Sequence, residues 1–274
     1  MKQAKITVLG AGGFIGGQLV HHLGLQGREC HAPARGDEAL YRAPLGHVIY
    51  AIGMTADFRH RPIETAEAHV CLLQRLVHAG NFESLTYLSS TRVYARSTDT
   101  RESAHLRVNP NDLDDLYNLS KLMGESLCLH SGHPLVKVAR LSNVIGLRRD
   151  PHVFINQLIE EGFRTGRVAF RTTLESRRDY VGIEDVVDLI VRMALSPETG
   201  IYNVASGQGI SNGEIASALA EQMGFEISVV PDAPVWDFAD IDVSRVKAKF
   251  AFSPRRFSDY FPAFLHSYRQ SRGI

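Results

Sequence analysis

The glycines that follow a short apolar run at the start of the chain constrain its fold most. The stretch Ile6–Gly17 reads ITVLGAGGFIGG, with glycines at positions 10, 13 and 16. It predicts a strand, a tight turn and a helix start, where missing Cβ atoms let backbone N–H groups approach a phosphate. An ordinary strand-to-helix turn is the alternative, but the position after an N-terminal strand favours a dinucleotide pyrophosphate. The residues expected to contact it are Gly10, Gly12, Gly13, Phe14, Ile15 and Gly16.

The bulk composition predicts a globular protein without a nucleic-acid or membrane partner. The 274 residues are 44% hydrophobic, and 30 basic side chains balance 30 acidic ones. Zero net charge gives no global attraction to nucleic acid. The arginine-rich segment at 148–178 lacks the regular interleaving of aromatic residues that a nucleic-acid-binding patch shows. No apolar run reaches the roughly 18 residues of a membrane span and no leader precedes the first strand, so we expect a cytoplasmic protein.

Cysteine and histidine positions predict neither a disulfide framework nor a metal site. Cys30, Cys71 and Cys128 are far apart and odd in number, which fits buried thiols in a reducing compartment. The 12 histidines form no H-x-H or H-E-x-x-H pattern. We therefore expect no bound metal.

Alternating apolar runs and helical patterns predict repeated βα units. They indicate an α/β fold, a Rossmann-type doubly wound parallel sheet with a small C-terminal substrate-binding lobe. Strands are expected near 5–9, 28–34, 46–52, 84–89, 135–140 and 202–205, and helices near 14–26, 64–80, 112–131 and 211–223. The expected domains are a dinucleotide-binding domain of residues 1–145, to which 179–205 return, and a smaller lobe of 146–178 and 206–274.

The end of the second predicted strand bears on which dinucleotide binds. NAD-binding folds usually place an acid there, against the ribose 2′-hydroxyl, whereas here Ala34 is followed by Arg35. A guanidinium suits a 2′-phosphate, which favours NADP(H); the alternative is NAD(H), with Arg35 a solvated loop residue. Only about a dozen residues precede the next strand, too few for a complete helix and strand, so one βα unit is expected to be shortened or absent.

Tyr117 and Lys121 form the candidate catalytic pair. They stand in a Y-x-x-x-K pattern within a predicted helix, which places both side chains on one face. A neighbouring ammonium stabilises a phenolate, so we expect the pKa of Tyr117 to fall from its ordinary value near ~10 and the phenol to serve as an acid or base.

The order of these motifs resembles the short-chain dehydrogenase/reductase superfamily. The glycine motif is followed by Leu88–Tyr94 (LSSTRVY) and then by Y-x-x-x-K. More narrowly, the chain is similar to the extended, NAD-dependent epimerase/dehydratase branch, which acts on nucleotide sugars. Supporting segments are RLSNVIG at 140–146, RDYVGIEDVV at 178–187, YNVASG at 202–207 and DVSRVKAK at 242–249.

The resemblance implies a role for individual residues. Ser90 would hydrogen-bond the reacting sugar oxygen, Tyr117 would exchange the proton, and Lys121 would bind the nicotinamide ribose. Other residues expected to line the cofactor are Ile52, Gly53 and Ser142, and the expected substrate contacts are Ser90, Thr91, Asn143, Arg171 and Arg178. Most of the arginines at 148, 149, 164, 167, 171, 177 and 178 are expected to form a solvated face, with Arg178 and Arg171 favoured for the substrate diphosphate.

The chain also departs from the family pattern. Sugar 4,6-dehydratases carry an Asp-Glu pair directly after the catalytic Thr, whereas this chain has Thr91 and Arg92, so dehydration is disfavoured. His69 stands where an Asn is common, and we interpret it as a packed, hydrogen-bonded histidine rather than a functional one.

These features together predict an enzyme, a keto-sugar reductase that uses NADPH. A nucleotide-sugar 4-epimerase with tightly bound NAD is the main alternative. A non-catalytic nucleotide-sensing protein is a minor one, which the presence of Ser90, Tyr117 and Lys121 argues against. The resemblance also implies a homodimer in which helices 64–80 and 112–131 pair across a two-fold axis.

Overall fold

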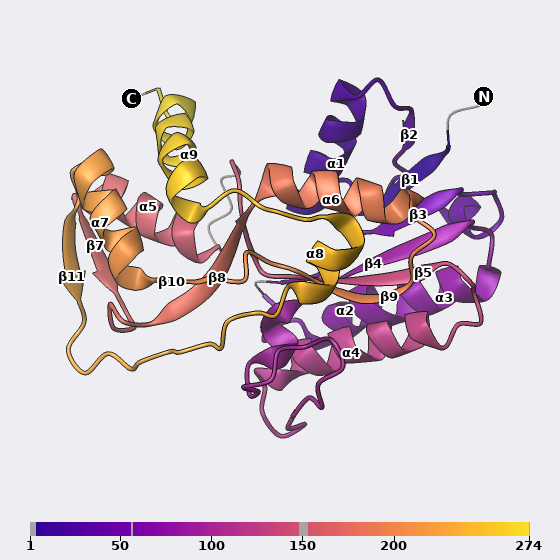
Figure 1. The fold of residues 1–274 in the computed structure, drawn as a ribbon, viewed down its shortest axis with the longest axis horizontal. Coiled ribbons are helices and arrows are strands. Elements are labelled where there is room, and N and C mark those ends of the chain that lie inside the picture. Colours follow the sequence, from indigo (N-terminus) through magenta and orange to yellow (C-terminus); the bar gives the residue numbers. More distant parts are fainter. Residues whose placement is uncertain (1–3, 56, 148–152, 274) are drawn as a thin grey trace.

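A six-stranded parallel sheet forms the centre of the computed structural model, which describes residues 4–55, 57–147 and 153–273 (Figure 1). The strand order is β2-β1-β3-β4-β5-β9, and every neighbouring pair is parallel. The strands are β1 (Ile6–Leu9), β2 (Cys30–His31), β3 (His47–Tyr50), β4 (Ser84–Ser90), β5 (Val136–Leu141) and β9 (Gly200–Val204). The α/β class and the doubly wound parallel sheet predicted from the sequence are thus confirmed.

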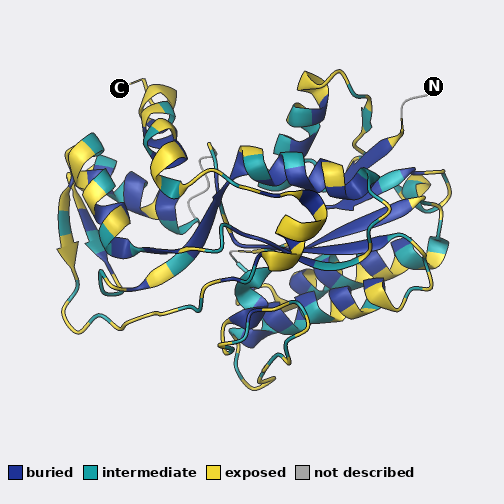
Figure 2. Ribbon diagram, in the orientation of Figure 1, coloured by how far each residue is buried: buried dark blue, intermediate teal, exposed yellow. Residues whose placement is uncertain are grey.

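Helices cover both faces of this sheet (Figure 1). One face carries α1 (Phe14–Leu25) and α6 (Ile183–Leu195); the other carries α2 (Pro62–Ala66), a π-helical turn (Glu67–Cys71), α3 (Leu72–Ala79) and α4 (Asp115–Leu129). Inner strands are buried throughout, as a parallel sheet covered on both faces requires (Figure 2). The helices predicted at 14–26, 64–80, 112–131 and 211–223 are present with ends shifted by a few residues, and the second is interrupted by the π-helical turn.

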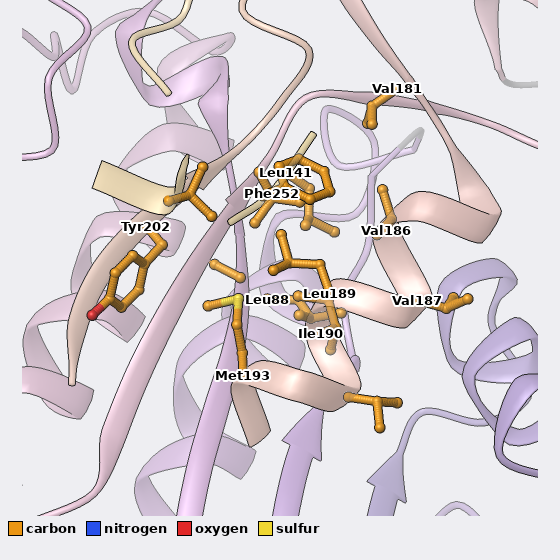
Figure 3. Close-up of a cluster of buried hydrophobic side chains, with 14 of the residues drawn as sticks. Leu88, Leu141, Val181, Val186, Val187, Leu189, Ile190, Met193, Tyr202 and Phe252 are labelled. Atoms are coloured by element: carbon orange, nitrogen blue, oxygen red, sulfur yellow. The ribbon is translucent and has the colours of Figure 1, made fainter. Parts of the chain in front are cut away.

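The core under α6 shows why this helix docks on the sheet. Val186, Leu189, Ile190 and Met193 recur at helical spacing and are buried. Figure 3 shows them packed in one cluster with sheet residues such as Leu141. Each such side chain contributes roughly 1.5–3 kcal/mol when it is fully removed from water, so this stripe fixes the face that α6 presents.

The edge of the sheet at β2 differs from the sequence prediction. The strand expected over 28–34 pairs with β1 only at Cys30 and His31, and Pro33 beyond it has no N–H for a ladder hydrogen bond. Between β2 and β3 the described residues form only a 3-10 turn, η1 (Glu38–Tyr41). Among the described residues β2 is the edge strand of the central sheet, and no further strand pairs with its outer side. This confirms the expectation that one βα unit is shortened or absent.

A second group of elements lies beside the carboxyl ends of the central strands and has an apolar core of its own (Figure 1). We refer to it as the small lobe. Its strands are β6 (Asn143–Ile145), β8 (Arg177–Gly182) and β10 (Gly209–Ser211) in one sheet, and β7 (Arg167–Phe170) and β11 (Glu226–Val229) in another. Its helices are α5 (Phe154–Thr165), α7 (Asn212–Met223) and α9 (Phe257–Ser271), while α8 (Ser244–Phe250) contacts β9.

The cysteines are buried to different degrees. Cys128 is buried, Cys30 is half-buried and Cys71 is exposed. The expectation of buried thiols is therefore wrong for Cys71, because His69 takes the inward position of the π-helical turn that holds it. No helix in the described part of the chain combines the length and apolarity needed to cross a bilayer.

Candidate active site

The turn after β1 is shaped by glycines that no other residue could replace without movement. Gly10 has a φ of +88°, and a Cβ there would lie 2.7 Å from the carbonyl carbon of Ala51. A Cβ on Gly16 would lie 2.2 Å from the Gly10 oxygen, so glycine is what allows α1 to start this close to β1. A Cβ on Gly12 would meet nothing within 4 Å, so this side of the turn is open.

The N-terminus of α1 has the properties of an anion site. Gly13 caps the helix without a side-chain hydrogen bond, and the first turn holds no acidic residue. The N–H groups of Phe14 and Ile15 therefore have no competing side-chain acceptor, and the helix dipole favours negative charge there. Ile52 lies against the turn, because a Cβ on Gly10 would be 2.8 Å from its nitrogen. These residues fit a dinucleotide pyrophosphate.

Tyr117 lies on the inner face of α4, with its hydroxyl near the carboxyl end of β4. The side chains of Ser90 and Thr55 lie next to this hydroxyl and favour its ionised form. Ser90 ends β4, and its Oγ also accepts a hydrogen bond of 3.2 Å from the backbone N–H of Arg92. Ser90 thus serves both as the cap of the following 3-10 turn, η3 (Thr91–Tyr94), and as a partner of the phenol.

Lys121 is buried one turn further along α4. Its ammonium donates a 2.9 Å hydrogen bond to the Leu88 oxygen and lies 5.9 Å from the centre of the Tyr117 ring. Burial lowers the pKa of Lys121 to about 7, because a charged ammonium is penalised away from water.

The expected effect of Lys121 on Tyr117 is not what the structure gives. Burial raises the pKa of Tyr117 above its ordinary value, and this cause outweighs those that lower it. The cation that favours the phenolate is Arg92, and the neighbouring side chains of Ser90 and Thr55 also favour it. The spacing of Tyr117 and Lys121 correctly placed both groups on one face, but it did not reveal how strongly water is excluded from that face.

His69 is packed and hydrogen-bonded, as the sequence analysis favoured. The Met54 N–H donates to its Nε2 at 3.1 Å, so its Nδ1 carries the proton and donates to Ser120 Oγ at 2.8 Å. Ser120 in turn donates to the Tyr117 backbone oxygen at 2.9 Å. Burial, with Lys121 adding to it, lowers the pKa of His69 to about 2, so the imidazole is neutral and links the β3 loop to α4.

Arg92 lies in the site beside the phenol. Its guanidinium carbon is 4.9 Å from the centre of the Phe58 ring and 5.6 Å from that of Tyr117. Burial lowers the pKa of Arg92, and the positive charges of Arg59 and Arg178 lower it further. Arg178 and Tyr117 are therefore both close enough to Arg92 to act on its charge.

The predicted substrate residues are distributed unevenly. Thr91 starts η3 next to Ser90. Asn143 Nδ2 donates to the Asp179 oxygen at 2.8 Å, and Ser142 is buried beside the Asp179 carboxylate. The Arg178 guanidinium packs 5.0 Å from the ring centres of both Phe154 and Trp236.

The other predicted arginines stand apart from this group. Arg171 is exposed and follows β7. Strand β7 belongs to a different sheet from β8, the strand that carries Arg178. Arg35 is exposed in the segment after β2. Arg148 and Arg149 lie outside the described residues.

A buried ion pair connects the elements that carry the site residues. Arg140 Nη2 lies 2.6 Å from Glu125 Oε2, and both side chains are 3% exposed. Ser89 also donates to the Glu125 carboxylate, and Arg140 Nη1 donates to the Tyr94 hydroxyl at 2.6 Å. This network joins β4, β5 and α4, the elements that carry Ser90 and Tyr117.

Sequence reasoning missed three residues that lie next to the phenol: Thr55, Phe58 and Arg92. Arg92 was noted only as a departure from dehydratases. Thr55 and Phe58 follow the strand expected at 46–52, and loops after parallel strands are where such folds bind ligands. That position was the available signal, since no motif marks either residue. The described residues hold no group of acidic, histidine and cysteine side chains that could bind a metal ion.

Comparison with solved structures confirms the fold. MoeE5 in complex with UDP-glucuronic acid and NAD is similar with a TM-score of 0.83 and 23% identity, over 98% of this chain and 100% of that one. RMD from Pseudomonas aeruginosa complexed with NADPH gives a TM-score of 0.80 and 22% identity, over 98% and 100%. A UDP-N-acetylglucosamine 4-epimerase from Methanobrevibacter ruminantium M1 gives 0.83 and 18%, over 99% and 100%.

Comparison of sequences identifies the family. A search of curated proteins found no match. The model of the NAD dependent epimerase/dehydratase family matches residues 6–205, which include the glycine turn, Ser90, Tyr117 and Lys121. The chain therefore belongs to the NAD dependent epimerase/dehydratase family.

Proposed function

We propose that this protein is an oxidoreductase of nucleotide-linked sugars, and specifically a keto-sugar reductase that uses NADPH. The observation that carries the proposal is the position of the Tyr117 hydroxyl, which lies next to Ser90 and Thr55 at the same sheet edge as the glycine turn. Ligands of open parallel α/β sheets bind at this edge. Gly10–Gly16 would hold the pyrophosphate, and Gly53, Lys121 and Ser142 would lie toward the nicotinamide.

The protonation of Tyr117 supports reduction. When bound, the nicotinamide supplies the hydride. The raised pKa of Tyr117 keeps its proton in place at neutral pH, so the phenol can donate that proton to a sugar carbonyl oxygen. Ser90 Oγ already accepts the Arg92 N–H, which leaves its own proton to hydrogen-bond the same carbonyl oxygen. The position after Ser90 and Thr91 holds an arginine, so the acid–base pair that dehydration needs is missing.

The position of Arg35 supports NADPH as the cofactor, whereas two other observations support an epimerase with bound NAD. Arg35 is exposed beyond β2, where a guanidinium can reach a 2′-phosphate.

A 4-epimerase with tightly bound NAD is the second candidate. It is supported by the solved relatives that are described as epimerases or as NAD complexes and by Asp37, an acid two residues beyond Arg35. The Asp37 side chain accepts the Ala39 N–H and has a second oxygen with which to accept from a ribose hydroxyl.

The remaining proposals concern the substrate-binding lobe and the oligomeric state. The smaller lobe of residues 146–178 and 206–274 would bind the substrate, which the position of Arg178 near Arg92 supports. A homodimer would form through α2–α3 and α4. Ile63 and Met123 support this surface, since they are 78% and 53% exposed on these helices.

Two measurements test the function. Mass spectrometry of the nucleotide released by denaturing the fresh protein separates the candidates: stoichiometric NAD favours the epimerase, whereas NADP(H) or no nucleotide favours the reductase. Tyr117→Phe should retain the dinucleotide but lose about 10²- to 10⁴-fold in turnover of a nucleotide-linked keto sugar. The control is Tyr260→Phe, which removes a hydroxyl that has no hydrogen-bond partner among the described residues. Dinucleotide binding without any turnover by the wild type would instead indicate a sensing protein.

A further inference from the structure

Arg92 occupies a position that the proposed reaction does not require. Its backbone N–H donates to the Oγ of the capping residue Ser90, but its guanidinium extends over the rings of Phe58 and Tyr117. The side chain is half-buried. A cation is thus held at the side of the reacting phenol, within the space that a sugar must enter.

The charge of Arg92 is not neutralised locally. Asp114 is the carboxylate that acts on it, but that carboxylate is already engaged by Arg59 Nε. Among the described residues neither Arg92 nor Arg178 has an ion-pair partner within 4.0 Å. Because the Arg59–Asp114 pair is neutral as a unit, Arg92 and Arg178 leave two uncompensated positive charges around the site. Half-buried cations without a carboxylate are costly to maintain, which points to anions supplied by the ligand.

The two arginines are placed for different anionic groups. The reacting sugar oxygen must come within roughly 3 Å of the Tyr117 hydroxyl. A guanidinium 5.6 Å from the ring centre of that tyrosine therefore faces the sugar ring and its substituents. Arg178, held among Phe154, Trp236 and Phe238 of the small lobe, is available to the diphosphate. A planar guanidinium binds a carboxylate through two parallel hydrogen bonds.

We propose that the substrate is a nucleotide-linked uronate and that Arg92 binds its carboxylate, which stands on the carbon next to the one that exchanges hydride. This inference rests on the proposed function. It makes Arg92 a specificity-determining residue, since a hexose with a neutral CH₂OH group at the same position would leave the guanidinium without its partner.

The test compares matched pairs of substrates that share one nucleotide, so that recognition of the base cancels. The pairs are UDP-glucuronate with UDP-glucose and GDP-mannuronate with GDP-mannose, each incubated with NADP⁺ and with NAD⁺. Absorbance reports the reduced nicotinamide and NMR reports any epimer. The variants are Arg92→Met and, as control, Arg164→Met, which removes an exposed arginine in the last turn of α5.

The wild type should prefer the uronate of one pair. Arg92→Met should lower kcat/KM for that uronate on the order of 100-fold, and far more than it lowers kcat/KM for the matched hexose. Arg164→Met should change neither. A binding titration in a Tyr117→Phe background gives a readout that does not depend on turnover, and Arg92→Met should weaken the uronate there by a similar factor. Equal melting temperatures and equal dinucleotide affinity exclude a folding defect.

The outcomes distinguish a failure of the uronate inference from a failure of the proposed function. If hexoses react as well as uronates, or if Arg92→Met lowers both members of a pair equally, the uronate inference is wrong and the proposed oxidoreductase stands. If no nucleotide sugar reduces either dinucleotide or is epimerised, and none binds to the Tyr117→Phe protein, the proposed function itself fails and takes the inference with it.

Discussion

Replacing Arg140 by Met should destabilise the protein strongly through the carboxylate that it leaves behind. Arg140 donates to both oxygens of Glu125, at 3.0 Å and 2.6 Å, and both side chains are 3% exposed. In the variant, Ser89 would be the hydrogen-bond donor that remains to this carboxylate. Removing one member of a buried ion pair typically costs about 3–5 kcal/mol. For a chain of this size, that corresponds to a fall in Tm of roughly 5–9 °C.

This cost is measured by urea unfolding of the wild type, Arg140→Met, Glu125→Leu, their double variant and one control. The double variant with Arg140→Met and Glu125→Leu should be more stable than the single Arg140→Met variant, because no charge is left buried. The control is Arg167→Met, which breaks an ion pair whose two side chains are 71% and 64% exposed and should cost less than about 1 kcal/mol. A cost below about 1 kcal/mol for Arg140→Met, or a double variant that costs the sum of its singles, would refute the reasoning.

Three further outcomes are expected. Lys137 is buried without a hydrogen-bond partner among the described residues, and burial lowers its pKa to about 8. Lys137→Met should therefore raise Tm by roughly 2–5 °C at pH 7. Melting curves should show this gain shrinking as the pH rises above 8 and vanishing above 10.5, where both states of the wild type are neutral. Lys121→Met should likewise stabilise the fold but weaken dinucleotide binding in a fluorescence titration, and unchanged affinity would remove Lys121 from the cofactor site. Met123→Glu should give monomers in sedimentation velocity where the wild type gives dimers; a monomeric wild type at micromolar concentration would contradict the proposed interface.

The parts of the fold that the sequence predicted well are those set by local chemistry. The strand, turn and helix at residues 6–25 depend on glycines that sit next to one another in sequence. Helix 115–129 carries Tyr117 and Lys121 four positions apart, a spacing that also lies within a short window of sequence. By contrast, the length of β2 depends on pairing along the sheet edge, and the π-helical turn depends on how His69 fits against α4. Neither is encoded in a short window of residues.

The surroundings of Tyr117 illustrate the same limit at the site. Arg92 precedes Tyr117 by 25 positions and His69 precedes it by 48, so their contacts with its ring arise only when η3 and the π-helical turn pack against α4. The motif predicted which side chains share a face of α4. It could not predict which cation reaches the phenol, because that depends on three elements folding together.

Burial of the catalytic face separates proton exchange from charge recognition. Excluding water raises the pKa of Tyr117 and lowers that of Lys121 to about 7, so near neutral pH the phenol keeps its proton and the amine is only partly charged. Arginine behaves differently, because its guanidinium stays charged even when its pKa is lowered by several units. Arg92 is therefore the permanent cation beside the phenol, whereas Tyr117 is the group able to deliver a proton. This division of roles supports the proposal that the site binds an anionic sugar through an arginine, rather than a second lysine, and protonates the carbonyl oxygen of that sugar.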